Sequence, residues 1–153
     1  MQHLSVDIAA AFKEGRRARL LIVDDNPFIR DLHTIVLRMT GYEVETAENG
    51  VEALERLADT PFDLVVTDRY MPGIDGVTVI LALRSAGSNI PVIMVSASLS
   101  YTGLPPLIAR EVFAAFSKPA NTADILRAVA EALQPGEAEE RRRRPQGLRE
   151  LAA

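Results

Sequence analysis

The sequence Arg19-Leu-Leu-Ile-Val-Asp24-Asp25-Asn26-Pro27 decides the fold of this chain. Its first part, through Val23, is apolar after the arginine, as in a strand that is buried on both faces. Asn26 and Pro27 then supply an N-cap and a first-turn proline for a helix. A buried strand that leads directly into a helix is typical of a parallel α/β sheet.

The same alternation of short apolar runs and helical patterns continues to residue 134. Further strands are expected at residues 42–46, 62–67, 91–95 and 112–116. Further helices are expected from Val51, over 77–84, and after a cap at Thr122. Gly103, Pro105 and Pro106 weaken any helix between the last two strands. The pattern therefore predicts an α/β fold with five strand–helix units around a five-stranded parallel sheet.

The helix after the first strand is expected to bury one apolar face and to stop at Gly41. Its apolar residues at helical spacing are Phe28, Ile29, Leu32, Ile35, Val36 and Met39. His33 falls off that face, and neither it nor His3 has a metal-ligand partner in the pattern. Both histidines are therefore left out of the candidate site.

Composition excludes several classes of protein. The 153 residues contain no Cys and no Trp, so a disulfide framework, a thiolate metal site and a base-stacking platform are not expected. No apolar run approaches the length of a membrane span, no secretion signal is seen, and no Gly-x-Gly-x-x-Gly follows the first strand. The expected location is the cytoplasm, without membrane insertion.

Charge divides the chain into three parts. The net charge is −4, but residues 20–134 carry eight basic and fifteen acidic groups, which gives −7. An acidic body argues against nucleic-acid binding and suits a site that collects a divalent cation. We expect an N-terminal extension over 1–18, one domain over 19–134, and a charged, disordered tail over 135–153.

The N-terminal extension has apolar residues at helical spacing between residues 4 and 14. They predict a short extra helix, whose stripe of Ile8 and Phe12 either packs on the domain or helps two copies form a homodimer. The Arg141–Arg144 run follows several glutamates and has no aromatic residues between its charges. A solvated tail is therefore the better interpretation of that run than a nucleic-acid contact.

Reactive side chains stand at four of the five strand ends. They are Asp24 with Asp25, Asp68, Ser96 and Lys118. The carboxyl ends of parallel strands meet at one edge, where ligands bind. Three carboxylates brought together there repel one another unless a hard cation such as Mg²⁺ lies among them. A lysine and a hydroxyl beside them suit phosphoryl transfer to an aspartate.

These motifs, in this order, resemble the receiver domain of two-component response regulators. The resemblance rests on Leu-Ile-Val-Asp24-Asp25-Asn-Pro, Asp68-Arg-Tyr-Met-Pro-Gly-Ile-Asp-Gly76, Val-Ser96-Ala and Lys118-Pro119, and it covers roughly residues 19–134. It implies a flavodoxin-like, doubly wound (βα)5 fold that belongs to the same superfamily as CheY. That fold agrees with the strand count reached from the pattern alone.

The resemblance also implies a role for each residue of the site. Asp68 would accept the phosphoryl group from a phosphohistidine on a histidine kinase or phosphotransfer protein. Mg²⁺ would be bound by Asp25, by Asp68 and by the backbone carbonyl of Tyr70, with Asp24 acting through water. Lys118 would pair with the phosphoryl oxygens, and Ser96 would move to hydrogen-bond them. Pro119 would follow a cis peptide bond.

Two positions depart from the family pattern. Three residues before the lysine, where the family usually has a Tyr or Phe that rotates on activation, this chain has Ala115. Phe116 comes one residue later, so it is expected to point to the opposite face, into the core. We therefore expect signalling without an aromatic switch. Tyr70 and Ser98 are expected to flank the acyl phosphate and to influence its lifetime.

The resulting expectation is a single-domain response regulator that is a phosphoacceptor switch and not an enzyme. Nineteen residues after the last helix are too few for an output domain, so its signal is expected to pass through contact with an unidentified protein target. A phosphorelay intermediate or phosphate sink is the alternative. A Mg²⁺-dependent phosphatase with an aspartyl-phosphate intermediate is less favoured, because Tyr70 stands where such enzymes place an acid/base aspartate.

Overall fold

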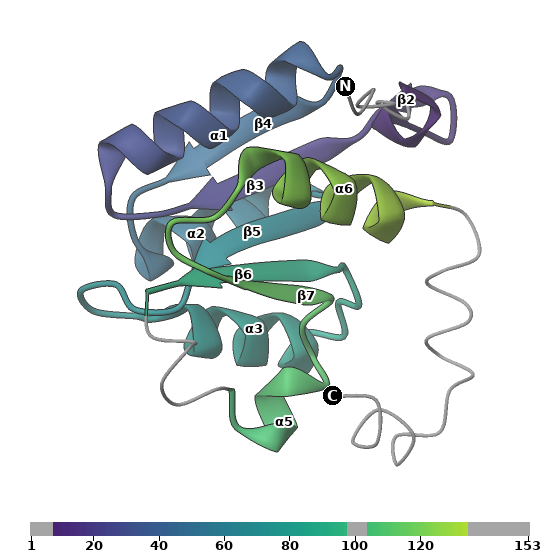
Figure 1. The fold of residues 1–153 in the computed structure, drawn as a ribbon. Coiled ribbons are helices and arrows are strands. Elements are labelled where there is room, and N and C mark those ends of the chain that lie inside the picture. Colours follow the sequence, from purple (N-terminus) through teal and green to yellow (C-terminus); the bar gives the residue numbers. More distant parts are fainter. Residues whose placement is uncertain (1–7, 98–103, 135–153) are drawn as a thin grey trace.

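A five-stranded sheet forms the centre of the molecule in the computed structural model, which describes residues 8–97 and 104–134 (Figure 1). All of its pairings are parallel and the strand order is β4-β3-β5-β6-β7. The strands are β3 Arg19–Val23, β4 Glu43–Ala47, β5 Leu64–Asp68, β6 Val92–Ser96 and β7 Ala114–Ser117. This confirms the predicted fold class and strand count, with bounds that differ by two residues or fewer.

Helices cover both faces of this sheet. They are α1 Pro27–Met39, α2 Gly50–Asp59, α3 Gly76–Ser85, α5 Pro106–Ala109 and α6 Thr122–Leu133. Figure 1 shows α1 and α6 on one face and α3 and α5 on the other. Because side chains alternate along a strand, Leu20 and Ile22 of β3 pack toward α1 and α6, whereas Leu21 and Val23 pack toward α2, α3 and α5.

The helix starts follow ordinary capping chemistry. The Asn26 side chain accepts hydrogen bonds from the backbone N–H groups of Phe28 and Ile29, so the predicted cap of α1 is confirmed. The predicted cap of the last helix is wrong by one residue, because Asn121 caps α6 and Thr122 is its first residue. Among the described residues between β6 and β7, the four-residue helix α5 begins at Pro106, directly after the first proline of the pair.

Helix α1 turns a different face to the sheet than its apolar spacing predicts. The buried residues are His33, Thr34 and Leu37. Most of the expected apolar face lies in solvent instead: the exposed members are Phe28, Leu32, Ile35 and Met39. The prediction of the buried face is therefore wrong. The packed side is narrow, and Leu37 with the partly buried Ile29 and Val36 supplies its apolar contact.

The N-terminal extension forms a 3-10 turn and a small hairpin in place of the predicted helix over 4–14. The elements are η1 Ile8–Ala11, β1 Phe12–Lys13 and β2 Arg16–Arg17, while residues 1–7 lie outside the described part of the chain. Glu14 and Gly15 both have positive φ, at 56° and 78°, which turns the chain back on itself. Phe12 therefore lies in a strand of the hairpin, although its spacing from Ile8 is that of a helix.

The hairpin is attached to the sheet by one buried carboxylate. Arg16 donates two hydrogen bonds to Asp63, at 2.8 and 3.0 Å, and the backbone N–H of Arg19 donates a third at 2.8 Å. Lys13 lies 3.6 Å from the same carboxylate. Burial alone would raise the pKa of Asp63, but the arginine and the backbone N–H outweigh burial and hold the pKa below its usual value.

Within residues 8–97 and 104–134, none of the helices combines the length and apolar character needed to cross a bilayer.

Candidate functional site

The predicted site residues lie together at the carboxyl end of the sheet. Asp24 directly follows β3, Asp68 and Ser96 are the last residues of β5 and β6, and Lys118 directly follows β7. Strand β3 lies between β4 and β5, so the chain changes its winding direction there. Ligands of doubly wound sheets bind at such a switch point. The topology therefore explains why residues 94 positions apart can meet.

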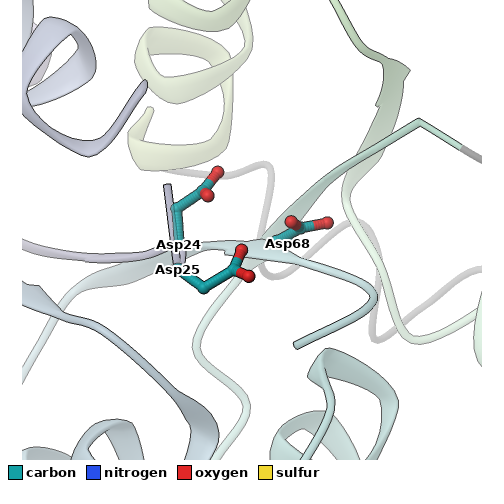
Figure 2. A group of neighbouring side chains, drawn as sticks. All are labelled: Asp24, Asp25 and Asp68. Carbon is teal, nitrogen blue, oxygen red and sulfur yellow. The ribbon is translucent and has the colours of Figure 1, made fainter. Parts of the chain in front are cut away.

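Three carboxylates form the acidic part of the site. One oxygen from each of Asp24, Asp25 and Asp68 can be chosen so that all three lie within 4.8 Å of one another (Figure 2). Asp24 and Asp68 are buried, whereas Asp25 is exposed. Because like charges at this distance repel strongly, the arrangement favours a bound cation.

Lys118 is the cation that the fold itself supplies. Its Nζ lies 2.9 Å from Oδ2 of Asp24 and 2.9 Å from Oδ2 of Asp68. The backbone N–H of Lys118 donates to the carbonyl of Ser96, which fixes the start of the loop that carries the lysine. The Lys118–Pro119 peptide bond is cis, as predicted. The ammonium thus bridges the two buried carboxylates.

Burial and charge shift the proton affinities of this pair. Burial raises the pKa of Asp68; the Lys118 ammonium opposes the rise without cancelling it, and the Asp24 carboxylate adds to it. Burial alone would lower the pKa of Lys118, but its bonds and attraction to Asp68 and Asp24 outweigh burial and raise the pKa. The lysine therefore stays charged at neutral pH. Burial makes the ionised form of Asp68 less favourable, and a further cation beside it would reduce that free-energy cost.

Local hydrogen bonds hold Asp24 in place. Its Oδ1 accepts from the backbone N–H of Asn26 at 2.9 Å, and its carbonyl accepts from the Arg30 guanidinium at 2.8 Å. Asn26 in turn caps α1. The turn after β3 and the first turn of the helix thus position one carboxylate together.

The loop after Asp68 is held against the sheet by a close backbone contact. A Cβ added to Gly76 would lie 2.2 Å from the carbonyl oxygen of Asp68, so only glycine fits there. The N–H of Gly76 donates to the carbonyl of Arg69 at 2.8 Å, and the N–H of Tyr70 donates to the Asp68 carboxylate. Asp68 is thereby fixed from both its backbone and its side chain.

Tyr70, which follows this contact, has a half-exposed ring. Its exposed fraction is 49%, and the Arg69 guanidinium stacks 4.9 Å from the ring centroid. The ring is thus supported by its neighbour on an otherwise open loop. Ser98, the other residue expected to flank the site, lies outside the described residues.

Strand β7 carries the departure from the family pattern at Ala115. Ala115 is exposed, and Phe116 packs with the core on the α1 and α6 side of the sheet. This is the face that the one-residue offset predicts for Phe116. Ser96 is buried at the neighbouring strand end. The structure therefore has no aromatic ring at position 115 beside that serine.

His33 is a residue near the site that sequence reasoning missed. It is buried on α1, and burial lowers its pKa, while Asp24 raises it and Lys118 lowers it by their charges. The prediction that it lies off the packed face is wrong, because the packed face of α1 is not the apolar one. No spacing motif in the sequence marks this position.

The residues present fit a divalent cation such as Mg²⁺. The site offers three carboxylates against one ammonium, and two of the three are buried. Hard oxygen ligands with open space on the exposed Asp25 side are what Mg²⁺ prefers, because it keeps part of its water shell. Asp24, Asp25 and Asp68 are the side chains that would hold it.

Comparison with known proteins agrees with this fold and site. The family model of the response regulator receiver domain matches residues 20–130, so the chain belongs to the response regulator receiver domain family. Members of this family act in two-component signalling as phosphoacceptor switches that bind Mg²⁺ at an acidic site. Membership implies an interaction with a histidine kinase or phosphotransfer partner.

Individual relatives show how far the similarity extends. The response regulator MprA of Mycobacterium sp. (strain KMS) is 42% identical over 79 residues, which cover 52% of this chain and 34% of the relative. The MprA protein of Mycobacterium ulcerans matches with the same identity and coverage. The chain spans about a third of the length of these relatives, so their whole activity does not transfer with the match.

Solved structures cover the chain more fully. The response regulator TrrA of Thermotoga maritima, in complex with Mg²⁺-BeF, has a TM-score of 0.68 and 34% identity, covering 75% of this chain and 98% of that chain. A CheY-like receiver domain protein of Methanospirillum hungatei has a TM-score of 0.70 and 27% identity, covering 82% and 97%.

Proposed function

We propose that Asp68 accepts a phosphoryl group from a phosphohistidine of a kinase or phosphotransfer protein. The observation that carries this proposal is the Lys118 ammonium, bonded to the buried carboxylates of Asp24 and Asp68 at the switch point of the sheet. A cation bound to an acceptor carboxylate is already where the charge of an incoming phosphoryl group would develop. The family membership supports the same role.

The transfer assigns one task to each residue. An oxygen of Asp68 attacks phosphorus, the P–N bond to the donor histidine breaks, and its electron pair returns to the imidazole. Lys118 stays charged and pairs with the phosphoryl oxygens, while the Ser96 hydroxyl donates to one of them. Bound Mg²⁺ supplies further positive charge for those oxygens. Its proposed ligands are Asp25, Asp68 and the Tyr70 carbonyl, with Asp24 acting through water.

The experiment is phosphorylation by acetyl phosphate in the presence of Mg²⁺, read on a phosphate-affinity gel. Asp68→Asn should remove the shifted band, because the amide cannot form the acyl phosphate. Asp59→Asn, an exposed carboxylate at the end of α2, is the matched control and should leave the band unchanged. A band that persists on Asp68→Asn would overturn the assignment.

We further propose that the phosphorylated chain signals by protein–protein contact from the cytoplasm and has no catalytic activity on other substrates. The alanine at position 115 supports a read-out through the Ser96 loop and the fourth-helix region, without an aromatic switch. Back-transfer from phospho-Asp68 to a histidine protein separates the alternatives: efficient return would identify a relay intermediate or sink, and none would support an adaptor.

A further inference from the structure

Arg30 reaches from α1 back to the turn that carries two of the three site carboxylates. Its Nη1 donates to the backbone carbonyl of Asp24 at 2.8 Å, and its side chain is only 14% exposed. A hydrogen bond from a charged donor is roughly twice as strong as one between neutral groups. The bond therefore holds the Asp24 carbonyl more firmly than an ordinary turn contact would.

The peptide unit that Arg30 holds lies between Asp24 and Asp25. Because the peptide group is planar, fixing the Asp24 carbonyl also fixes the direction of the Asp25 N–H. Figure 2 shows the two side chains leaving this turn in different directions. Lys118 and the N–H of Asn26 also hold the carboxylate of Asp24. Asp25 is exposed, so the direction of its carboxylate depends mainly on the backbone that Arg30 holds.

The other end of the Arg30 guanidinium faces the start of α2. Its Nη2 lies 3.7 Å from Oε1 of Glu48, and the N–H of Glu48 donates to Glu52 at 3.0 Å. Because Glu48 is 69% exposed, this ion pair adds less than the carbonyl bond. Two residues further on, a Cβ added to Gly50 would overlap the carbonyl oxygen of Ile74. The start of α2 therefore lies between Arg30 and the loop after β5.

Charge and geometry predict opposite effects of Arg30 on a bound divalent cation. As a positive charge near three carboxylates, Arg30 would repel the cation, so its removal would tighten binding. As a holder of the turn, it would keep the carboxylates in place, so its removal would weaken binding. The contacts favour the second role, because the guanidinium bonds to the Asp24 carbonyl and pairs with Glu48, which lies outside the group of three carboxylates.

We propose that Arg30 is a positioning residue of the cation site, which sets the direction of the Asp25 carboxylate through the peptide unit before it. This rests on the proposed function, in which Mg²⁺ at this site assists phosphoryl transfer to Asp68. Removing a group that orients a metal ligand typically weakens metal binding by roughly 10- to 100-fold. Arg30 acts on one of the three carboxylates through the backbone, so we expect the lower end of that range.

Titration of the full chain with Mg²⁺ alone, followed in amide NMR spectra, tests this role and shows that each variant is folded. Arg30→Met removes both the donor and the charge, and it should weaken Mg²⁺ binding roughly tenfold. Arg30→Lys keeps the charge but replaces the planar fork of donors with a single ammonium, so it should recover only part of the affinity. A purely electrostatic role would reverse the order: Arg30→Met would bind more tightly than the wild type, and Arg30→Lys equally well.

A second arginine of α1 supplies the matched control. Arg38 donates to the Val44 carbonyl at 2.9 Å, so Arg38→Met removes the same charge and the same kind of bond in the last turn of the helix. Eight residues separate the two arginines, which is about 12 Å along the helix. This exceeds the Debye length at physiological salt, so Arg38→Met should keep the Mg²⁺ affinity within about twofold of the wild type.

Hydrogen exchange of the chain without Mg²⁺ gives a second readout. The N–H of Asn26, which donates to Oδ1 of Asp24, should exchange faster in Arg30→Met than in the wild type, because the turn is held less firmly. Arg38→Met should leave that exchange rate unchanged.

Three results would overturn the proposal: an Arg30→Met chain that binds Mg²⁺ as tightly as the wild type or more tightly, an equal loss in Arg38→Met, or a wild type that binds no Mg²⁺. Labelling of the wild type by acetyl phosphate is measured separately. A wild type that is labelled on Asp68 while Arg30→Met keeps its Mg²⁺ affinity overturns the positioning role alone. An unlabelled wild type whose Mg²⁺ binding still depends on Arg30 overturns the phosphoacceptor role alone.

Discussion

Replacing Lys118 with methionine removes the one ammonium that contacts both buried carboxylates of the site while keeping a side chain of similar length. Lys118 is 16% exposed, and the side chains of Asp24 and Asp68 are 5% and 9% exposed. Breaking a buried ion pair by removing one partner typically costs about 3–5 kcal/mol of the free energy of unfolding. The loss here has a ceiling, because a proton can take the place of the lost cation.

That ceiling depends on pH. For an ordinary carboxyl with a pKa of 3.8, protonation costs about 4 kcal/mol at pH 7 and about 1.6 kcal/mol at pH 5, since each pKa unit is worth about 1.4 kcal/mol. We therefore expect Lys118→Met to lose about 3–4 kcal/mol at pH 7 and less than about 2 kcal/mol at pH 5. At the alkaline end, the raised pKa of Lys118 means that its contribution is lost only as pH rises from 10.5 through its folded-state pKa.

Urea denaturation followed by far-ultraviolet circular dichroism measures this loss, since the chain has no Trp. Mg²⁺ should stabilise the variant more than the wild type, because the variant leaves the carboxylates of Asp24 and Asp68 without their ammonium partner. Lys13→Met is the control: Lys13 is 43% exposed and lies 3.6 Å from Asp63, so its loss should cost less than about 1 kcal/mol. An equal loss at pH 5 and pH 7, unaffected by Mg²⁺, would refute the reasoning.

Three further predictions concern the anchor, the loop and the acyl phosphate. Asp63→Asn should cost about 2–3 kcal/mol at pH 7. Because the native pKa of Asp63 is lowered, that cost should shrink as pH falls below about 4 in urea titrations; a constant cost would exclude a charge effect. Gly76→Ala should cost about 1–3 kcal/mol and weaken Mg²⁺ binding in calorimetry, since its Cβ would displace the Asp68 carbonyl; unchanged affinity would argue against that coupling. Tyr70→Ala should shorten the lifetime of phospho-Asp68 without changing Mg²⁺ binding, because the ring limits the access of water to the acyl phosphate. Tyr70→Phe keeps the ring and should leave the lifetime unchanged. An unchanged decay rate of labelled Tyr70→Ala protein would contradict this role.

The strand ends could be predicted from the sequence because a short apolar run leads up to each polar residue of the site. Asp24 and Ser96 directly end such runs, and Asp68 follows Leu64-Val-Val-Thr67; parallel topology then brings the three residues together. The predicted meeting of Asp24 and Asp68 with Lys118 is confirmed by the 2.9 Å contacts of its ammonium. The chemical roles of the four residues stay predictions until phosphorylation is measured.

Two features could not be predicted from local pattern. Apolar spacing on α1 indicates that one face of the helix is apolar, but not whether the sheet covers that face. The spacing therefore predicts that Phe28 and Met39 are buried and His33 is not, which is the reverse of what the structure shows. The N-terminal hairpin depends on Arg16 meeting Asp63, 47 residues away, and no periodicity encodes such a contact. Long-range pairing and a second apolar face are the points at which local rules fail.

The attachment of the hairpin to Asp63 changes where this domain can be cut. The family match begins at residue 20, so a truncation at that boundary would remove Lys13, Arg16 and the N–H of Arg19 together. The carboxylate of Asp63 would remain at the start of β5 without any of these donors. The smallest piece of the chain that folds with its charges satisfied therefore begins before the hairpin, and not where the family resemblance starts.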